Sequence, residues 1–577
     1  MNPLLASLPL SLFGLLPQTP ATTDMAAEVR LFQADHEALS RFYDIRLSSE
    51  RSLRMKAFLA DRAAKLEKID FDSLDREGKV DFVLLRSHIR HEQKELAHQE
   101  LRDEESRKLL PFAGTIIRLE EDRRHMKFPD AREAADLVNG IDEAVHVVRE
   151  SLEKKTEGPD GEETQSVSPV TARRAARALD ALRSTFKTWF RQNDGYQPEF
   201  GWWVREPYQK AAKDLEDYAG YLRNDLAGIK DEDDDPLIGD PIGREALLDD
   251  LEAEMIPYSP EELIAIGEEQ FAWCEERMKE ASAELGFGDD WHKALAHVKD
   301  LYVPPGKQED LILEQARFVI DFLDKHDLVT IPPLCRETWR LDMLSADRQR
   351  FLPFAAYGGQ KMLVAYPLER MDHERKLMSM RGNNIHFSRI VTPHELIPGH
   401  HLQGFMAARQ HTYRRIFSTP FLGEGWALYW EMLLWDLGYA RGPEDRIGML
   451  FWRMHRCARI LVSLRFHLGE MAPEEMIDFL VERVGHEEDG ATAEVRRYIS
   501  GGYGPLYQCA YMIGGLQLRA LHEELVGGGV MDDRGFHDAI LRQNSIPVEM
   551  IRAALTEAPL SPDYRPNWKF AGEHPGR

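Results

Sequence analysis

The chain has 577 residues, of which 43% are hydrophobic and 30% are charged, and its formal net charge is -26. A chain of this length and composition can bury a large core without disulfides or structural metals. Its acidic balance repels phosphate backbones, so we expect no nucleic-acid partner. The four cysteines are scattered without a CxxC pair, and we expect them to be small core residues.

The first 24 residues differ from the rest of the chain. Residues 3–17 are nearly all apolar and a polar stretch follows at 18–23, as in a signal peptide, although the first basic residue is Arg30. We expect export to the periplasm or the medium. The alternative is a disordered or helical extension of a cytoplasmic protein. No later run is long and apolar enough to span a bilayer, so no stable membrane insertion is expected.

Residues 25–560 are predicted to form a single, mainly α-helical domain. Apolar residues recur at spacings of three and four in a charged background, which is typical of amphipathic helices. The breaks at 154–169 and 231–241 interrupt this pattern with glycine, proline and acidic residues, and we expect loops there. The tail at 561–577 is polar and rich in proline, which predicts irregular structure.

A small β-sheet is expected between residues 328 and 391, where the sequence pattern changes. Three short runs rich in β-branched and aromatic residues, at 329–331, 362–366 and 385–391, are predicted to be strands. The last run precedes the candidate site. We expect its edge to pair with the backbone of an extended peptide.

The candidate site begins at His394 and Glu395. Zinc peptidases commonly supply two ligands and a catalytic carboxylate from HExxH on one helix. Here proline occupies position 398, so no strict HExxH is present, but histidines follow at 400 and 401. In an ideal helix His394 and His400 would be about 9 Å apart along the axis and on different faces. A break at the Pro398-Gly399 step would bring them together, and the residues alone leave open whether His400 or His401 is the ligand.

Two glutamates follow on a helix that is otherwise apolar and aromatic. Glu424 and Glu431 are seven residues apart, so both project from one face. Burial of a carboxylate without a partner is costly, and a metal or a basic network would supply one. The alternative is that one glutamate reaches solvent while the other pairs with an arginine such as Arg453 or Arg459.

Three tyrosines near the C-terminus form a third element. Tyr503, Tyr507 and Tyr511 are spaced four residues apart, and the last two share a helix face if Pro505 begins a helix. A tyrosine hydroxyl can donate a hydrogen bond to the oxyanion of a tetrahedral intermediate. The alternative is that these are core aromatics whose hydroxyls bond the backbone.

Together these elements resemble a bacterial family known as domain of unknown function 885. The hallmark HExxPGHxxQ is matched by His394, Glu395, Pro398, Gly399, His400 and Gln403, and EGWAxYxE by Glu424, Gly425, Trp426, Ala427, Tyr429 and Glu431. An arginine-rich helix that ends in histidine is matched more loosely by Arg459 and His467, with Ser463 where many members carry aspartate.

The resemblance implies a large zincin-like helical domain with a deep central channel, distantly related to thimet oligopeptidase, carboxypeptidase Taq and angiotensin-converting enzyme. By analogy, His394, His400 and Glu424 would bind Zn2+ and Glu395 would activate water.

Tyr511 or Tyr507 would stabilise the oxyanion, and His467 and Glu431 would orient the ligands. The expected function is hydrolysis of peptide bonds in short peptides. The alternatives are a metal-dependent hydrolase of a non-peptide amide or ester, and an inactive helical binding protein.

Overall fold

The computed structural model describes residues 23–156, 167–230, 237–349, 351–499 and 502–571. It is mainly helical with one small sheet, as the sequence predicts. The expected signal peptide or extension lies almost wholly outside the described residues. Parts of the two predicted loops and of the tail also lie outside them. None of the described helices is long and apolar enough to cross a membrane.

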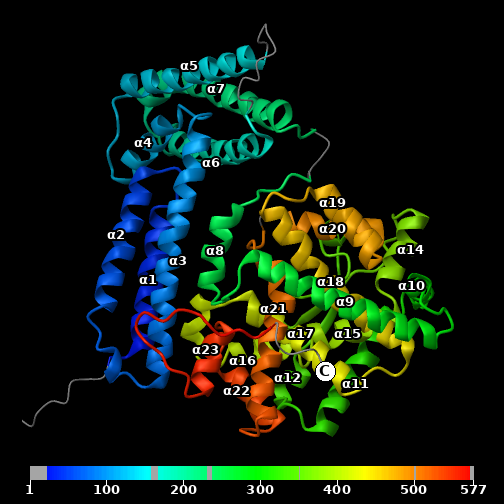
Figure 1. Ribbon diagram of the computed structural model, residues 1–577. Coiled ribbons are helices and arrows are strands. Elements are labelled where there is room, and N and C mark those ends of the chain that lie inside the picture. The colour runs from blue at the N-terminus through cyan, green and yellow to red at the C-terminus, as the bar shows by residue number, and fades with distance from the viewer. Residues whose placement is uncertain (1–22, 157–166, 231–236, 350, 500–501, 572–577) are drawn as a thin grey trace, which may run out of the picture.

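Three long helices form a column at one side of the molecule (Figure 1). Asp24, Ser48 and Asp75 accept hydrogen bonds from the first turns of these helices, which are typical N-caps. The helices are α1 (Met25–Phe42), α2 (Ser49–Leu66) and α3 (Arg76–Arg107).

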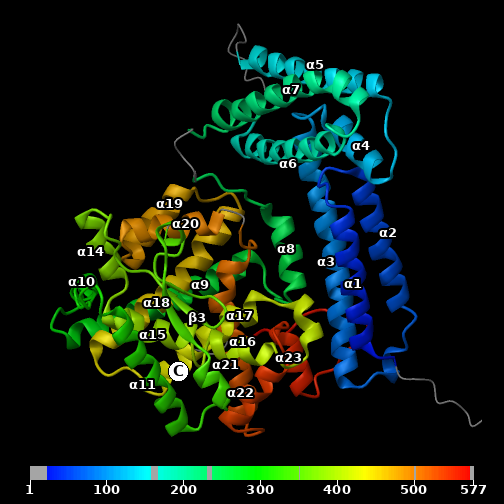
Figure 2. The ribbon, with the colours of Figure 1, turned by 180° about the vertical axis from the view of Figure 1, so that it is seen from behind.

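Four helices form an arm that lies across one end of the column in both views (Figures 1 and 2). They enclose most of a hydrophobic cluster of their own, separate from the large cluster shared by the column and the rest of the chain. The arm consists of α4 (Ala113–Arg124), α5 (Ala131–Thr156), α6 (Pro169–Asn193) and α7 (Pro198–Tyr221).

The remaining helices form a body beside the column (Figure 1). In chain order they are α8 (Gly243–Ala253), α9 (Pro260–Glu284), α10 (Trp291–Lys299), α11 (Gln308–His326), α12 (Pro333–Glu337), α13 (Ala346–Gln349), α14 (His373–Gly382), α15 (Ile385–Glu395), α16 (His400–Ala407), α17 (Pro420–Asp436), α18 (Pro443–His467), α19 (Pro473–Phe479), α20 (Glu488–Ile499), α21 (Tyr507–His522), α22 (Asp533–Arg542) and α23 (Val548–Leu555). Short 3-10 or π segments are η1 (Phe71–Ser73), η2 (Leu222–Leu226), η3 (Thr412–Phe417), η4 (Leu480–Val484) and η5 (Glu523–Gly527).

A buried ion pair joins the column to the body. Asp81 of α3 accepts from Arg414 Nε at 2.7 Å and from the Tyr413 hydroxyl at 2.6 Å. Burial raises the pKa of Asp81, although the arginine and the tyrosine oppose that shift. All four cysteines are buried and free, as predicted.

The sheet has three strands in the order β1-β3-β2. β1 (Arg340–Met343) runs parallel to β3 (Lys361–Val364), and β2 (Ala355–Tyr357) pairs antiparallel with β3. The predicted strand at 362–366 is therefore confirmed in β3. Within this sheet β2 pairs with β3 alone, so it forms one edge of the sheet.

The other two predicted strands are wrong. Residues 385–391 belong to helix α15, because Asn384 caps that helix and accepts from the backbone amides of His386 and Phe387. Residues 329–331 join no sheet, and the Thr330 amide donates instead to Asp538 Oδ1 at 3.0 Å. Apolar runs buried on every side lose the periodicity that separates helix from strand, which explains the error at 385–391. The expected peptide-binding edge there is wrong for the same reason.

Candidate metal centre

The segment that carries the histidines is not one continuous helix. α15 ends at Glu395, α16 begins at His400, and a cis Ile397–Pro398 peptide bond lies between them. A Cβ at Gly399 would lie 1.8 Å from the backbone oxygen of His394, so only glycine fits in this turn. The break that the sequence predicts at this step is confirmed.

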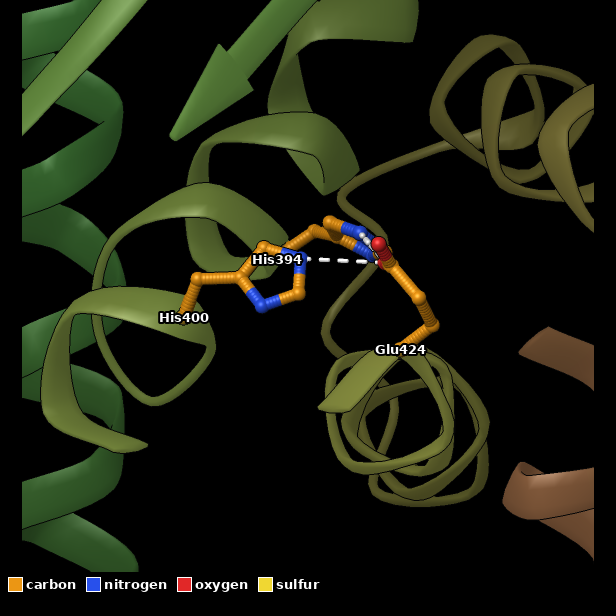
Figure 3. A group of neighbouring side chains, drawn as sticks. All are labelled: His394, His400 and Glu424. Atoms are coloured by element: carbon orange, nitrogen blue, oxygen red, sulfur yellow. Dashed lines mark hydrogen bonds and ion pairs between the residues drawn. The ribbon is translucent and has the colours of Figure 1, made fainter. Parts of the chain in front are cut away.

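Across the break, the side chains of His394, His400 and Glu424 converge (Figure 3). Glu424 Oε2 lies 3.1 Å from His400 Nε2 and 3.6 Å from His394 Nε2. One ligand atom of each residue lies within 4.8 Å of the others. Two imidazole nitrogens and one carboxylate oxygen, with a further position left for water, are a donor set typical of catalytic zinc sites. These residues therefore fit the metal that the sequence predicts.

Glu431 fixes the orientation of the His394 ring. Its Oε1 lies 2.6 Å from His394 Nδ1, so the hydrogen sits on that nitrogen and Nε2 faces Glu424 and His400. Both glutamates of α17 are buried, and the arginine that contacts Glu431 is Arg456, at 3.7 Å. The alternative is wrong in placing one glutamate in solvent. Glu431 does have an arginine beside it, but this is Arg456 and not Arg453 or Arg459.

The charges of this group are strongly coupled. Burial disfavours the charged ring of His394, but hydrogen bonds to Glu424 and Glu431 outweigh burial and raise the pKa of His394 to about 9. Burial likewise opposes ionisation of Glu424, yet His400 and His394 hold its pKa well below the usual value. A buried carboxylate beside two imidazoles is thus kept ionised, as a metal ligand must be.

His401 points away from the group. Its Nε2 lies 2.9 Å from the backbone oxygen of Cys335, and its Nδ1 lies 3.2 Å from the Tyr357 hydroxyl. Burial lowers the pKa of His401, which favours the neutral ring. Because both nitrogens already have partners, the geometry selects His400 as the second candidate ligand.

A cavity of about 380 Å³ is lined by the three candidate ligands together with Glu395, Tyr507 and Tyr511. The Tyr507 hydroxyl donates to Glu424 Oε1, whereas the Tyr511 hydroxyl accepts from Arg497 Nη2 at 3.1 Å. Among the residues that the structure describes, none donates a hydrogen bond to the Glu395 carboxylate. Glu395 therefore stands open to a molecule in the cavity.

Close backbone packing brings the tyrosines to the site. A Cβ at Gly514 of α21 would lie 1.9 Å from the backbone oxygen of Phe421, and a Cβ at Gly425 would lie 2.6 Å from Gly514 Cα. α17 and α21 thus touch backbone to backbone, which side chains at these positions would prevent. This contact sets Tyr507 against Glu424.

Three arginines, two of them buried and one partly buried, complete the wall of the cavity, and the sequence did not predict them there. Arg456 and Arg459 come from α18 and Arg497 from α20. All three surround Tyr511, because the first two stack over its ring at 4.8 and 4.4 Å and the third bonds its hydroxyl. The three-residue spacing of Arg456 and Arg459 on a buried helix is the signal that points to a shared face.

His467 lies outside this group. It is buried at the C-terminal end of α18, but it is not among the residues that line the cavity. Its Nδ1 has no hydrogen-bond partner among the described atoms, and burial lowers its pKa to about 4. The structure shows no contact through which His467 would orient the ligands.

A second set of possible metal ligands lies in the arm. One ligand atom each of Asp142, His146 and Asp214 lies within 4.8 Å of the others. The His146 side chain is 57% exposed, however, and Lys210 already neutralises Asp142 at 2.8 Å. The buried group around His394 is the stronger candidate.

The chain matches one protein family and is similar in fold to solved structures. The profile of the family described as "Bacterial protein of unknown function (DUF885)" matches residues 36–555. A solved structure from Shewanella oneidensis, "a putative lipoprotein of unknown function", is 17% identical with a TM-score of 0.66 and covers 92% of this chain and 100% of its own. A "putative lipoprotein from Colwellia psychrerythraea" is 18% identical with a TM-score of 0.56 and covers 92% and 98%. These likenesses show a shared fold, and no curated protein matches the chain.

Proposed function

Because this chain belongs to the bacterial family of unknown function DUF885, we propose its function from the site itself: zinc-dependent hydrolysis of peptide bonds. The observation that carries the proposal is the convergence of His394 Nε2, His400 Nε2 and Glu424 Oε2 in a cavity that also holds the Glu395 carboxylate. Two histidines, a glutamate and a neighbouring free carboxylate are the groups that zinc peptidases use.

His394, His400 and Glu424 would hold the zinc ion, which when bound lowers the pKa of water and polarises a carbonyl group. Two further residues prepare these ligands. Glu431 bonds His394 Nδ1 and so leaves Nε2 for the metal, and Tyr507 bonds Glu424 Oε1 and so leaves Oε2.

Glu395 is the proposed general base. Its carboxylate takes a proton from the attacking water as the new C–O bond forms, and gives that proton to the amine as the C–N bond breaks. The absence of hydrogen-bond donors to Glu395 among the described residues supports this role, because its oxygens are available to water.

Tyr511, rather than Tyr507, is the proposed donor to the oxyanion. The hydrogen of the Tyr507 hydroxyl is already engaged with Glu424. The Tyr511 oxygen instead accepts from Arg497, which leaves its own hydrogen free for a developing negative charge. An adjacent guanidinium also strengthens a phenol as a donor.

The edge strand β2 supports a peptide as the substrate. Its residues Ala355–Tyr357 line the cavity, and only one of its edges is occupied, by β3. An extended peptide can pair with such an edge through its backbone, which a small ester or amide cannot do along its length.

The test is turnover by the variant Glu395→Gln. We expect it to keep its metal and its fold while losing hydrolysis of a peptide library that the wild-type protein cleaves. The surface variant Glu268→Gln, on α9, is the control and keeps full activity. Wild-type-like turnover in Glu395→Gln would show that Glu395 is not the general base. If the wild-type protein cleaved only simple esters, the proposal that its substrates are peptides would be wrong.

We also propose that the protein is exported. The apolar stretch at 3–17 supports export, as do the names of the two structural neighbours, each described as a "putative lipoprotein". Cell fractionation with sequencing of the mature N-terminus tests it: full-length protein found only in the cytoplasm would contradict it.

A further inference from the structure

The cavity of the candidate site carries an excess of positive side chains in a strongly acidic protein. Four arginines line it, Arg348, Arg456, Arg459 and Arg497, against the three carboxylates of Glu395, Glu424 and Glu494. The chain as a whole has a net charge of -26. A bound divalent cation would make the cavity more positive still. The four arginines therefore concentrate positive charge at the site of a chain whose net charge is negative.

Arg456 and Arg459 are not fully matched by carboxylates among the described residues. Arg459 donates to Glu494 at 2.6 Å, and Arg497 also lies 3.7 Å from that glutamate. Among the described residues, Glu431 is the one carboxylate within 4.0 Å of Arg456, at 3.7 Å, and the oxygen concerned already bonds His394 at 2.6 Å.

Two nitrogens on this wall, Arg456 Nε and Arg459 Nη1, are buried without a hydrogen-bond partner among the described atoms. The side chains of Arg456 and Arg459 are only 7% and 2% exposed. A buried guanidinium without full compensation is costly, and a ligand that supplies the missing acceptor would remove that cost. A carboxylate is the natural complement, since its two oxygens match the guanidinium fork.

We infer that this arginine wall binds a carboxylate of the substrate, so that the site takes peptides with a negative charge close to the scissile bond. The inference rests on the proposed peptidase function and names its substrate class. Arg456 is the central residue, because it lies between the ligand-orienting Glu431 and the ring of Tyr511. The carboxylate is supplied either by the free C-terminus of a short peptide or by an acidic side chain.

The test is calorimetric binding to the full-length variant Glu395→Gln, which should bind without cleavage. Three probes share an acetylated amino end: trialanine with a free carboxylate, trialanine amide, and the amide of alanyl-glutamyl-alanine. We expect one or both acidic probes to bind at least about tenfold more tightly than the neutral amide. Preference for the first acidic probe identifies the C-terminus as the source, and preference for the second identifies a side chain.

A second change, Arg456→Gln in the same background, should reduce binding of the acidic probe to the level of the amide while amide binding and metal content stay unchanged. The matched control is Arg453→Gln on the same helix. Arg453 is also buried, but it bonds Gln270 and stacks on Trp273 outside the cavity. If Arg456→Gln fails to fold, the exposed Arg348→Gln serves in its place, with a weaker loss in the same direction.

Equal binding of all three probes would overturn the inference, as would equal loss of acidic and neutral binding in Arg456→Gln. Neither result would affect metal content or turnover, which test the proposed function separately. Conversely, if the protein bound acidic peptides but neither held metal nor cleaved peptides, the carboxylate-binding site would be supported and the proposed peptidase function would be wrong.

Discussion

The hydrogen bond between Glu431 and His394 allows a quantitative prediction about metal affinity. In Glu431→Gln, a neutral amide oxygen replaces a buried carboxylate 2.6 Å from His394 Nδ1. The ring loses a charge-assisted bond that holds its tautomer and its orientation, and Arg456 loses its neighbouring negative charge. Loss of such a partner typically weakens metal binding by about 10- to 100-fold, which corresponds to about 1.4–2.8 kcal/mol.

The assay is competition for zinc with a chelator of known affinity. Wild-type protein, Glu431→Gln and the surface control Glu268→Gln are compared after each has been stripped and reloaded. We expect a weaker dissociation constant only for Glu431→Gln, while the circular dichroism spectrum of the stripped variant still shows the helical fold. Zinc affinity equal to wild type in Glu431→Gln would refute the reasoning that this carboxylate orients the ligand.

Three other predictions follow from the same structure. Gly399→Ala places a Cβ 1.8 Å from the His394 backbone oxygen, so we expect this variant to lose zinc and to fold poorly. The control Gly404→Ala, whose Cβ would have its nearest neighbour at 3.7 Å, should keep both its zinc and its fold. Zinc retention in Gly399→Ala would contradict this prediction.

Because the pKa of His394 is about 9 before metal binds, zinc addition at pH 7 should release about one proton, and affinity should rise with pH up to about 9. Calorimetry in two buffers of different ionisation enthalpy measures the proton, and an identical heat in both would argue against it. The same shift stabilises the stripped protein fully below pH 6.5, and that contribution is lost as pH rises through about 9. Arg414→Met leaves Asp81 buried with only a hydroxyl partner and should lower the free energy of unfolding by about 3–5 kcal/mol in urea titrations, and a loss below 1 kcal/mol would show that the ion pair is dispensable.

The sequence was sufficient to predict the helical class and to name side chains that converge in space, because both depend on local patterns. Glu424 and Glu431 had to share a face at a spacing of seven, and both indeed contact His394. The Pro398-Gly399 step had to interrupt the helix. Which histidine then joined His394 depended on the geometry of the turn, which no spacing rule fixes.

Other features depended on contacts between distant segments. Residues 385–391 resemble a strand in composition, and only the cap at Asn384 indicated a helix. The position of Arg456 could not be predicted because α18 is buried along almost its whole length, so this residue contacts α17 and α21 in addition to Trp452 of its own helix. The sequence likewise gave no information on which residues surround His467, and in the structure this residue does not line the cavity.

The central claim is that His394, His400 and Glu424 bind one zinc ion. Its most direct test is elemental analysis of the purified protein beside His394→Ala, His400→Ala and His401→Ala. We predict about one zinc per chain in the wild type and in His401→Ala, and none in the other two variants. No metal in the wild-type protein even after zinc is added, or zinc lost only from His401→Ala, would contradict the account.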